Sequence, residues 1–250
     1  MMAESRVYVI TGASGIGRAT ALRLVRDGAR VGVVDIDSTA NEAVQVAAGE
    51  RADAMVTYAA NVADGTAARR IIEDLLARWG RLDGLVTCAG ASGRVPIADM
   101  PLSEWTRVLD INLRGTFVYC KAVVPPLLIR GRGAIVVTSS HLAYEGAPQA
   151  THYATAKGAT ESLMRSLARE LGPHGIRVNA LAPGPTDTLL PLGNSTSADL
   201  EEQQAMAART LLGRLGTIDD HAAGIAYLLS DEANFVTGQV LHVNGGCVMS

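Results

Sequence analysis

The chain has 250 residues, of which 48% are hydrophobic, so it is long enough to bury a sizeable core. Its 22 basic and 25 acidic residues leave a net charge of -3 and form no long runs. This charge distribution argues against nucleic acid and membrane surfaces as partners. Three scattered cysteines are too few for a disulfide framework or a paired-thiol zinc site, and the apolar run at residues 7–10 is too short for a signal peptide or membrane span. We therefore expect a cytoplasmic protein with reduced thiols.

Short runs rich in Val, Ile and Leu recur along the chain, each bounded by turn or polar residues, and they predict seven strands. The runs are residues 7–10, 30–36, 54–58, 82–88, 134–138, 177–181 and 240–243. Stretches with helical periodicity lie between them, such as residues 16–27, 67–79 and 154–171. Because apolar strands that alternate with helices pair in parallel, we expect an α/β fold: a doubly wound parallel sheet in three layers, α/β/α, forming one domain over residues 1–250.

One segment, residues 184–216, lacks clear periodicity and is polar in its middle. A long irregular insertion in a compact domain is usually a lid or a binding loop. We expect a substrate lid at about residues 186–215.

A glycine-rich turn, Thr-Gly-Ala-Ser-Gly-Ile-Gly at residues 11–17, follows the first predicted strand. It opens a helix whose free backbone N–H groups can receive a pyrophosphate. Tight strand-to-helix turns also need glycine for purely steric reasons, so the turn alone does not decide between the two interpretations. The candidate cofactor-binding residues here are Gly12, Ser14, Gly15, Ile16 and Gly17.

The second predicted strand ends in Asp35 and Ile36. Asp35 lies 18 residues after Gly17, where a carboxylate can accept hydrogen bonds from the adenosine ribose hydroxyls and would repel a 2′-phosphate. Neither Ser14 nor Ile36 supplies the positive charge that a 2′-phosphate needs, so the sequence favours NAD over NADP. Arg18 is the alternative source of charge, but helix geometry turns it away from the amides of the turn, and we interpret it as a solvated helix residue.

Tyr153 and Lys157 are spaced i and i+4, so they share one face if this stretch is helical. A lysine ammonium near a phenol stabilises phenolate, and we expect it to lower the pKa of Tyr153 from its ordinary value of about 10. Ser139 and Ser140 follow the predicted strand 134–138, and catalytic groups in open α/β sheets gather at the carboxyl ends of strands. An isolated Tyr-x-x-x-Lys is usually an ordinary surface pair; its neighbours make this one a candidate acid/base site.

These motifs, in this order, resemble the short-chain dehydrogenase/reductase family, whose pattern combines Thr-Gly-x-x-x-Gly-x-Gly, a serine thirteen residues before the tyrosine, and Tyr-x-x-x-Lys. The resemblance covers essentially the whole chain. It implies a Rossmann-type fold and an NAD-dependent hydride transfer between nicotinamide and a secondary alcohol or its ketone. It also implies that Tyr153 is the general acid/base and that Lys157 lowers its pKa and holds the nicotinamide ribose. In the same pattern Ser140 orients the substrate oxygen and Asn112 maintains a proton-relay water.

Other segments match the family's cofactor contacts. Asn61 and Val62 resemble the adenine contact, Ala89 and Gly90 belong to the cofactor loop, and Pro183, Gly184, Thr186 and Thr188 resemble the nicotinamide-side loop. The clearest departure is Thr87-Cys88-Ala89-Gly90, where the family commonly has Asn-Asn-Ala-Gly. We expect the Thr87 hydroxyl to substitute for an asparagine and Cys88 to be an inert core thiol, since the sequence shows nothing cationic beside it.

The five histidines show no metal-ligand spacing, and we expect no metal. His141 and His152 adjoin Ser140 and Tyr153 and are candidate substrate contacts. We expect the substrate pocket to be lined by residues 91–94, 141–146 and 189–215, with mixed character. Its candidate walls are Leu189, Leu190, Leu192 and Met206, and its candidate charged contacts are Arg94, Glu145 and Arg209.

The resemblance further implies a homotetramer, or a homodimer, assembled through residues 154–171 and 240–250. One rival function is a 3-oxoacyl-thioester reductase of the acyl-carrier-protein type, which residues 165–180 also resemble. Asp35 argues against it, since those reductases usually run on NADPH. A second rival is a catalytically silent NAD-binding scaffold, which a complete set of catalytic candidates disfavours.

Overall fold

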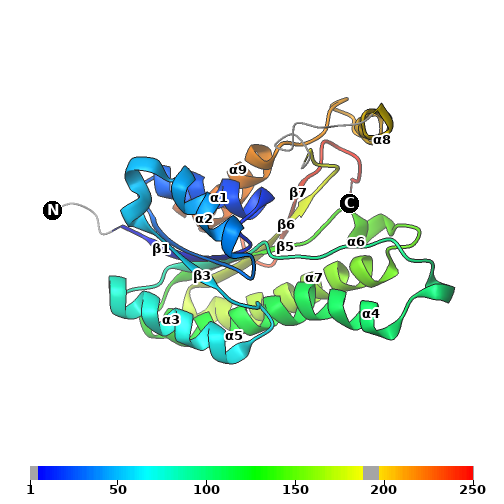
Figure 1. The fold of residues 1–250 in the computed structure, drawn as a ribbon. Helices are drawn as coiled ribbons and strands as arrows, with labels where there is room; N and C mark the ends of the chain where they lie inside the picture. Colours follow the sequence, from blue (N-terminus) through cyan, green and yellow to red (C-terminus); the bar gives the residue numbers. More distant parts are fainter. Residues whose placement is uncertain (1–4, 188–196, 250) are drawn as a thin grey trace.

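The computed structural model describes residues 5–187 and 197–249, and its centre is one seven-stranded sheet (Figure 1). Every neighbouring pair of strands is parallel, and the order is β3-β2-β1-β4-β5-β6-β7. The strands are β1 (Val7–Thr11), β2 (Arg30–Asp35), β3 (Met55–Ala59), β4 (Gly84–Thr87), β5 (Gly133–Thr138), β6 (Ile176–Pro183) and β7 (Val240–Val243). The predicted doubly wound, Rossmann-type α/β fold is confirmed, and all seven expected strands form.

Helices cover both faces of the sheet in Figure 1. One layer holds α1 (Gly15–Arg26), α2 (Ser38–Ala47) and α9 (Ile218–Leu229). The other holds α3 (Gly65–Trp79), α5 (Gly115–Arg130) and α7 (Thr151–Leu171), with α4 (Leu102–Leu109) packed on α7. The short α6 (Leu142–Glu145) precedes α7, and α8 (Ser197–Ala208) precedes α9. Within the described ranges no helix is long and apolar enough to cross a membrane.

The core divides into one apolar cluster on each face of the sheet. Along β1, Val7 and Val9 belong to one cluster while Tyr8 and Ile10 belong to the other, because successive side chains of a strand point to opposite faces. All five residues of β1 are buried, as expected for a central strand of a parallel sheet covered by helices on both sides.

The winding of the sheet reverses between β1 and β4, which are neighbours although two strands separate them in sequence. In open α/β sheets the loops at such a reversal diverge above and below the sheet and leave a crevice at the carboxyl ends of the strands. This edge, called the carboxyl edge below, therefore collects the glycine-rich turn, the end of β4 and the end of β5.

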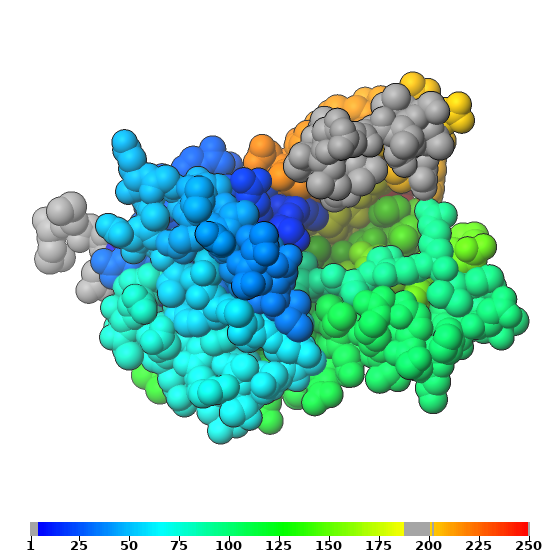
Figure 2. Space-filling view, viewed as in Figure 1, coloured from blue at the N-terminus to red at the C-terminus, as the bar shows by residue number. Residues whose placement is uncertain are grey.

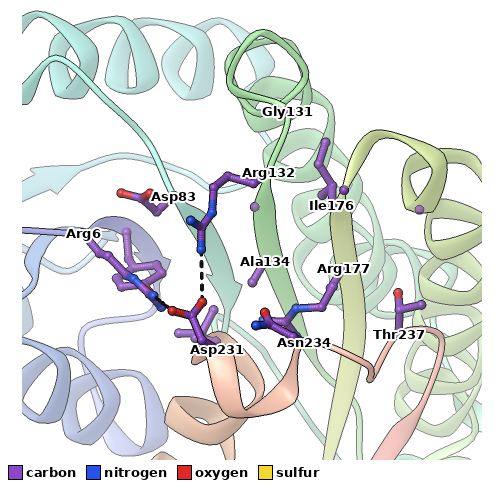
Figure 3. Close-up of a pocket in the computed structure, with 15 residues that line it drawn as sticks. Arg6, Asp83, Gly131, Arg132, Ala134, Ile176, Arg177, Asp231, Asn234 and Thr237 are labelled. Atoms are coloured by element: carbon purple, nitrogen blue, oxygen red, sulfur yellow. Dashed lines mark hydrogen bonds and ion pairs between the residues drawn. The ribbon is translucent and has the colours of Figure 1, made fainter.

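The opposite, amino edge of the sheet also carries a cavity, of about 500 Å³, lined by arginines (Figure 3). Arg6 and Arg132 both pair with Asp231, the latter at 3.1 Å between Nη2 and Oδ1. Arg177 instead donates to the carbonyl oxygens of Leu228 and Ser230, at 2.7 and 3.0 Å. These contacts tie the starts of β1, β5 and β6 to the segment after α9.

Candidate active site

Helix α7 places Tyr153 and Lys157 together, one turn apart at its N-terminal end. The helix begins at Thr151, three residues before the expected start, so Tyr153 already lies in its first turn. The Lys157 Nζ atom is 5.6 Å from the centroid of the Tyr153 ring and donates a hydrogen bond of 2.7 Å to the carbonyl oxygen of Thr138. The end of β5 thus fixes the lysine beside the tyrosine.

The pKa of Tyr153 differs from the expectation. Burial raises the pKa of Tyr153 above its ordinary value, and a hydrogen bond with Ser140 acts in the opposite direction. Burial also lowers the pKa of Lys157 to about 8. The anticipated lowering of the tyrosine pKa by the lysine is therefore not what this site shows: the loss of water around the phenol is the largest influence on this pKa, and the hydrogen bond with Ser140 is what opposes it.

The three hydroxyl residues at the end of β5 have separate partners. Thr138 receives Lys157 through its backbone oxygen, whereas the Ser139 hydroxyl donates 2.6 Å to Oε1 of the buried Glu161. Ser140 is the one whose hydroxyl meets Tyr153. Ser139 is thus engaged with Glu161, and Ser140 is the serine beside the tyrosine.

The sequence interpretation missed Glu161, although its spacing was a usable signal. Glu161 stands four residues after Lys157, so Tyr153, Lys157 and Glu161 follow one another at i, i+4 and i+8 on α7. Its Oε2 atom accepts a hydrogen bond of 2.9 Å from the hydroxyl of Tyr144 in α6. Glu161 therefore joins the end of β5 to α6.

Asn112 lies in a π-helical turn, η3 (Asp110–Arg114), inserted between α4 and α5. Its Nδ2 donates to the carbonyl oxygens of Ala91 and Val108, at 2.7 and 2.9 Å. Its Oδ1 is buried and has no hydrogen-bond partner among the described residues. Such turns are frequent at functional sites, and a buried acceptor left open is suited to holding a water.

Eight of the predicted cofactor residues line one cavity of about 240 Å³ at the carboxyl edge. Its lining includes Gly12, Ser14, Asp35, Ile36, Asn61, Val62, Ala89 and Gly90, all expected from the sequence, together with Ala60, Cys88 and Ile111, which were not. These segments come from the blue and the green parts of the chain, which meet along a seam on the face seen in Figure 2. The unexpected residues are apolar neighbours of motif residues and carried no signal of their own.

The glycine-rich turn is one residue shorter than the family pattern quoted above, since only Ala13 and Ser14 separate Gly12 from Gly15. Gly12 has a φ of 95°, and a Cβ there would lie 2.9 Å from the amide nitrogen of Ala89. Glycine is therefore required for the close passage of the turn over β4. Gly15, with a φ of 47°, opens α1, and the Ser14 side chain makes no capping hydrogen bond within the described chain.

The Asp35 carboxylate is partly used by the backbone. Its Oδ2 accepts from the Ala13 amide at 2.8 Å and its Oδ1 from the Asp37 amide at 3.0 Å. A carboxylate has about four acceptor positions, and these two amides use only part of them. The remaining positions, on the side that lines the cavity, can accept hydrogen bonds from ribose hydroxyls. Arg18, interpreted above as solvated, is half-buried, and its Nε is enclosed without a hydrogen-bond partner in the described part of the chain.

This cavity fits the adenosine half of a dinucleotide. It offers glycine backbone that lets a ligand come close, a carboxylate, and apolar walls formed by Ile36, Val62 and Ile111. The N-terminal amides of α1, uncapped by Ser14, suit a pyrophosphate.

One of the two expectations for the Thr87-Cys88 departure differs from the structure. Thr87 is buried, and its hydroxyl accepts a hydrogen bond of 3.4 Å from Thr116, as a substitute for an asparagine would. Cys88 packs partly buried against the apolar core and also lines the cavity, and Lys157 lies close enough to act on its charge. The inference that no cation lies nearby was wrong, because residues 69 apart in sequence meet here. The thiol is nevertheless not activated, since burial raises the pKa of Cys88 to about 11.

On the nicotinamide side, Thr186 is held in place. Its hydroxyl donates 2.8 Å to the carbonyl oxygen of Gly184 and lies 2.7 Å from Nε2 of His221. Burial lowers the pKa of His221 to about 4, so this ring is neutral at pH 7. Thr188, with the predicted wall residues Leu189, Leu190 and Leu192, lies outside the described residues.

The substrate side is organised by charge pairs. Glu145 Oε1 is 2.7 Å from Nη2 of Arg209 and 3.3 Å from Nε2 of His141, whose other ring nitrogen is 3.0 Å from the carbonyl oxygen of Pro183. Glu145 and Arg209, expected as substrate contacts, are thus paired with each other. His152 is fully buried and lies against Glu104. Among the residues described, no three His, Cys, Asp or Glu side chains are grouped to hold a metal ion.

Comparison with known proteins places the chain among enzymes of similar length. A family model described as enoyl-(acyl carrier protein) reductase matches residues 10–248. The 3-oxoacyl-(acyl-carrier-protein) reductase FabG of Thermotoga maritima is 34% identical over 250 residues, covering 100% of both chains. The short-chain reductase NovJ of Streptomyces niveus is 38% identical over 98% of this chain and 95% of its own. A probable short-chain type dehydrogenase/reductase of Bradyrhizobium diazoefficiens is 38% identical over 97% of this chain and 87% of its own. The chain belongs to the short-chain dehydrogenase/reductase family of oxidoreductases.

Proposed function

We propose that the protein is an NAD(H)-dependent oxidoreductase that interconverts a secondary alcohol and its ketone. The observation that carries the proposal is the meeting of Tyr153, Ser140 and Lys157 at the carboxyl edge, with Lys157 reaching both the tyrosine ring and the end of β5. A phenol held by a hydroxyl and a buried ammonium is suited to exchanging a proton with a substrate oxygen.

In this proposal the chain's own groups handle the proton and the orientation. Tyr153 donates its hydroxyl proton to the ketone oxygen during reduction and removes the proton from the alcohol during oxidation. Ser140 orients that oxygen, and Lys157 stabilises the phenolate. Asn112 holds a relay water at its open Oδ1 atom. When bound, the nicotinamide supplies or accepts the hydride.

The cofactor-binding residues of the proposal are those given by the sequence. Gly12, Ser14, Gly15, Ile16 and Gly17 would hold the pyrophosphate, Asp35 and Ile36 the adenosine ribose, Asn61 and Val62 the adenine, and Ala89, Gly90, Tyr153, Lys157, Pro183, Gly184, Thr186 and Thr188 the nicotinamide half. NAD is preferred over NADP because the Asp35 carboxylate on the cavity wall would repel a 2′-phosphate.

A second candidate is reduction of a 3-oxoacyl thioester on a carrier protein. It is favoured by the names of relatives such as FabG of Staphylococcus aureus, 36% identical over 251 residues. The description of the matching family model adds an enoyl thioester to the substrates worth testing. Asp35 argues against the NADPH-dependent form of either reaction.

We further propose that residues 1–250 act as one domain with a substrate lid at about 186–215. The Glu145–Arg209 pair supports this, because it joins the segment after α8 to the helix that follows Ser140. A homotetramer or homodimer is also proposed. Exposed apolar side chains on α5, Phe117, Leu128 and Ile129, add a candidate contact face to the expected α7 and β7. The free thiols of Cys88, Cys120 and Cys247 fit the proposed cytoplasmic location.

The deciding experiment follows absorbance at 340 nm with NAD or NADP, in both directions, against secondary alcohols, diols, ketones, and 3-oxoacyl and enoyl thioesters. We expect turnover with NAD and an alcohol or ketone, lost in Tyr153→Phe. A strong preference for NADP with thioesters would replace the first proposal by the second. NADH binding without turnover of any substrate would contradict both.

A further inference from the structure

His152 is a buried polar residue to which the proposed mechanism gives no task. It is the second residue of α7, directly before Tyr153, and is 0% exposed. Neither of its ring nitrogens has a hydrogen-bond partner among the residues described. Buried imidazoles are normally hydrogen-bonded, so the placement of this one calls for a reason.

The nearest charged group to His152 is on another helix. Glu104 of α4 places its Oε1 atom 3.6 Å from the Nε2 of His152. The same carboxylate accepts two hydrogen bonds from Arg107, from Nε to Oε2 at 2.7 Å and from Nη2 to Oε1 at 2.8 Å. Hydrogen bonding by Arg107, and then the nearby His152, lower the pKa of Glu104, so it is ionised at neutral pH. Glu104 is thus fixed and charged where it faces the imidazole.

The segment 91–95, called the strap below, runs alongside these groups. Arg107 donates to the carbonyl oxygen of Ser92 at 3.4 Å. A Cβ on Gly93 would lie 2.9 Å from the Oε1 of Glu104 and 3.6 Å from the Nε2 of His152. The strap therefore passes against the carboxylate–imidazole pair at a residue where only glycine fits without displacement.

The two ends of the strap are held by residues close to the proposed chemistry. Asn112 donates to the carbonyl oxygen of Ala91 at 2.7 Å, and the amide of Val95 donates to that of Gln149 at 2.8 Å. Gln149 has a φ of 64°, a left-handed conformation that is strained for a residue with a side chain and that persists only when its surroundings impose it.

We propose that His152 and Glu104 are positioning residues that set the strap against the first turn of α7, and with it the substrate relative to Tyr153. The inference rests on the proposed function, since the strap belongs to the expected substrate side of the pocket. The couple acts on the alcohol or ketone and not on the cofactor, because its contacts reach the strap and α4 and include none of the residues that line the adenosine cavity.

The test compares His152→Leu, which keeps an apolar side chain of similar size, with His152→Gln, which restores an N–H near the position of Nε2. We expect His152→Leu to raise the KM for the alcohol or ketone about 10-fold or more, because small misplacements of a substrate are costly. The Kd for NADH, measured by fluorescence, should stay within about twofold of its wild-type value, because the misplacement concerns the substrate and not the cofactor. His152→Gln should recover most of the loss.

Two further variants keep His152 in place. Glu104→Gln should raise KM in the same direction, and its effect should not add to that of His152→Leu, because both remove one contact. Gly93→Ala should also raise the KM, because the added Cβ would displace the strap. Arg78→Ala, on the far helix α3, is the matched surface control and should change nothing.

Amide hydrogen exchange of residues 92–95 separates this inference from the proposed function. Faster exchange of the strap in His152→Leu, with unchanged NADH affinity, would support the positioning role even if no substrate were turned over. Unchanged exchange, unchanged KM, or a parallel loss of NADH binding and melting temperature would overturn it.

Discussion

The two edges of the central sheet both carry charged and polar side chains, but they satisfy them differently. At the amino edge, Asp231 is paired with Arg6 and Arg132, and Arg177 is capped by carbonyl oxygens (Figure 3). At the carboxyl edge, the Oδ1 of Asn112 and the ring of His152 lack hydrogen-bond partners in the described chain. Since buried polar groups are normally paired, we expect a ligand at the carboxyl edge, and a cavity rich in arginine is no guide by itself.

The two edges also differ in how their charged groups affect the stability of the folded chain. The Arg6 and Arg132 pairs with Asp231 are substantially exposed, and such pairs contribute about 0–1 kcal/mol to stability. Lys157, by contrast, is buried without a carboxylate among the described residues, and its pKa falls to about 8. The carboxyl edge thus carries a cost in stability that its proposed chemistry explains.

The largest effect should come from removing the phenol hydroxyl. We expect Tyr153→Phe to lower kcat by about 10²- to 10⁴-fold while NADH binding and the melting temperature change little, because general acid/base catalysis is lost and packing is kept. Steady-state kinetics at several pH values are the measurement. The wild-type oxidation rate should still be rising with pH near 10, because burial raises the pKa of Tyr153. A near-normal kcat in Tyr153→Phe would show that Tyr153 is not the general acid/base.

The variant Lys157→Met tests whether the buried lysine destabilises the folded chain. Below pH 8 the lysine is protonated in both folded and unfolded chains; between about 8 and 10.5 the unfolded chain holds more protons, so stability rises with pH. The difference from 10.5 to about 8 corresponds to about 3 kcal/mol. The free energy of unfolding of the wild type relative to Lys157→Met should therefore increase across this range, as denaturant titrations would show. A pH-independent difference would mean that the ammonium is not desolvated.

Asp35→Ser tests the charge of the adenosine cavity. Removing a carboxylate about 4 Å from a 2′-phosphate relieves up to about 4 kcal/mol of repulsion at an effective dielectric of 20, less after screening, so we expect the NAD-over-NADP preference to fall at least about 10-fold. The ratio of kcat/KM for the two cofactors is the measurement, and Asp37→Asn, two residues on, is the matched control. An unchanged ratio would place the selectivity elsewhere.

Asp231→Asn should give the smallest effect and serves as the counterpart at the amino edge. We expect stability to fall by about 1 kcal/mol, because the two arginine pairs are solvent-screened, and kcat/KM to stay unchanged. Thermal melts and the 340 nm assay check both. A kinetic effect here would show that the two edges are coupled.

Much of the fold followed from the sequence because the strands are apolar runs with clear ends. Residues 240–243 form β7 as expected, and the other strands differ by only a few residues at their ends. The glycine-rich turn was predicted because a tight turn there needs glycine, and Asp35 and the end of β5 were predicted from their spacing and their position after strands.

The rest depends on contacts between distant segments. Cys88 and Lys157 meet only in the folded chain, and the pKa of Tyr153 depends on burial that periodicity does not report. The π-helical turn around Asn112 has no simple sequence signature. In the sequence Glu104 and Glu161 look like ordinary helix-surface acids, and only the fold shows that they face His152 and Ser139.

One consequence of α7 concerns tolerance to length changes. Tyr153, Lys157 and Glu161 stand on one stripe of a single helix, each four residues from the next. Each residue of an α-helix turns by about 100°, so one insertion or deletion between them would swing the later groups away from β5. We infer that an insertion or deletion within α7 between residues 153 and 161 would abolish the site in one step, whereas loops away from the carboxyl edge can change length without moving these groups.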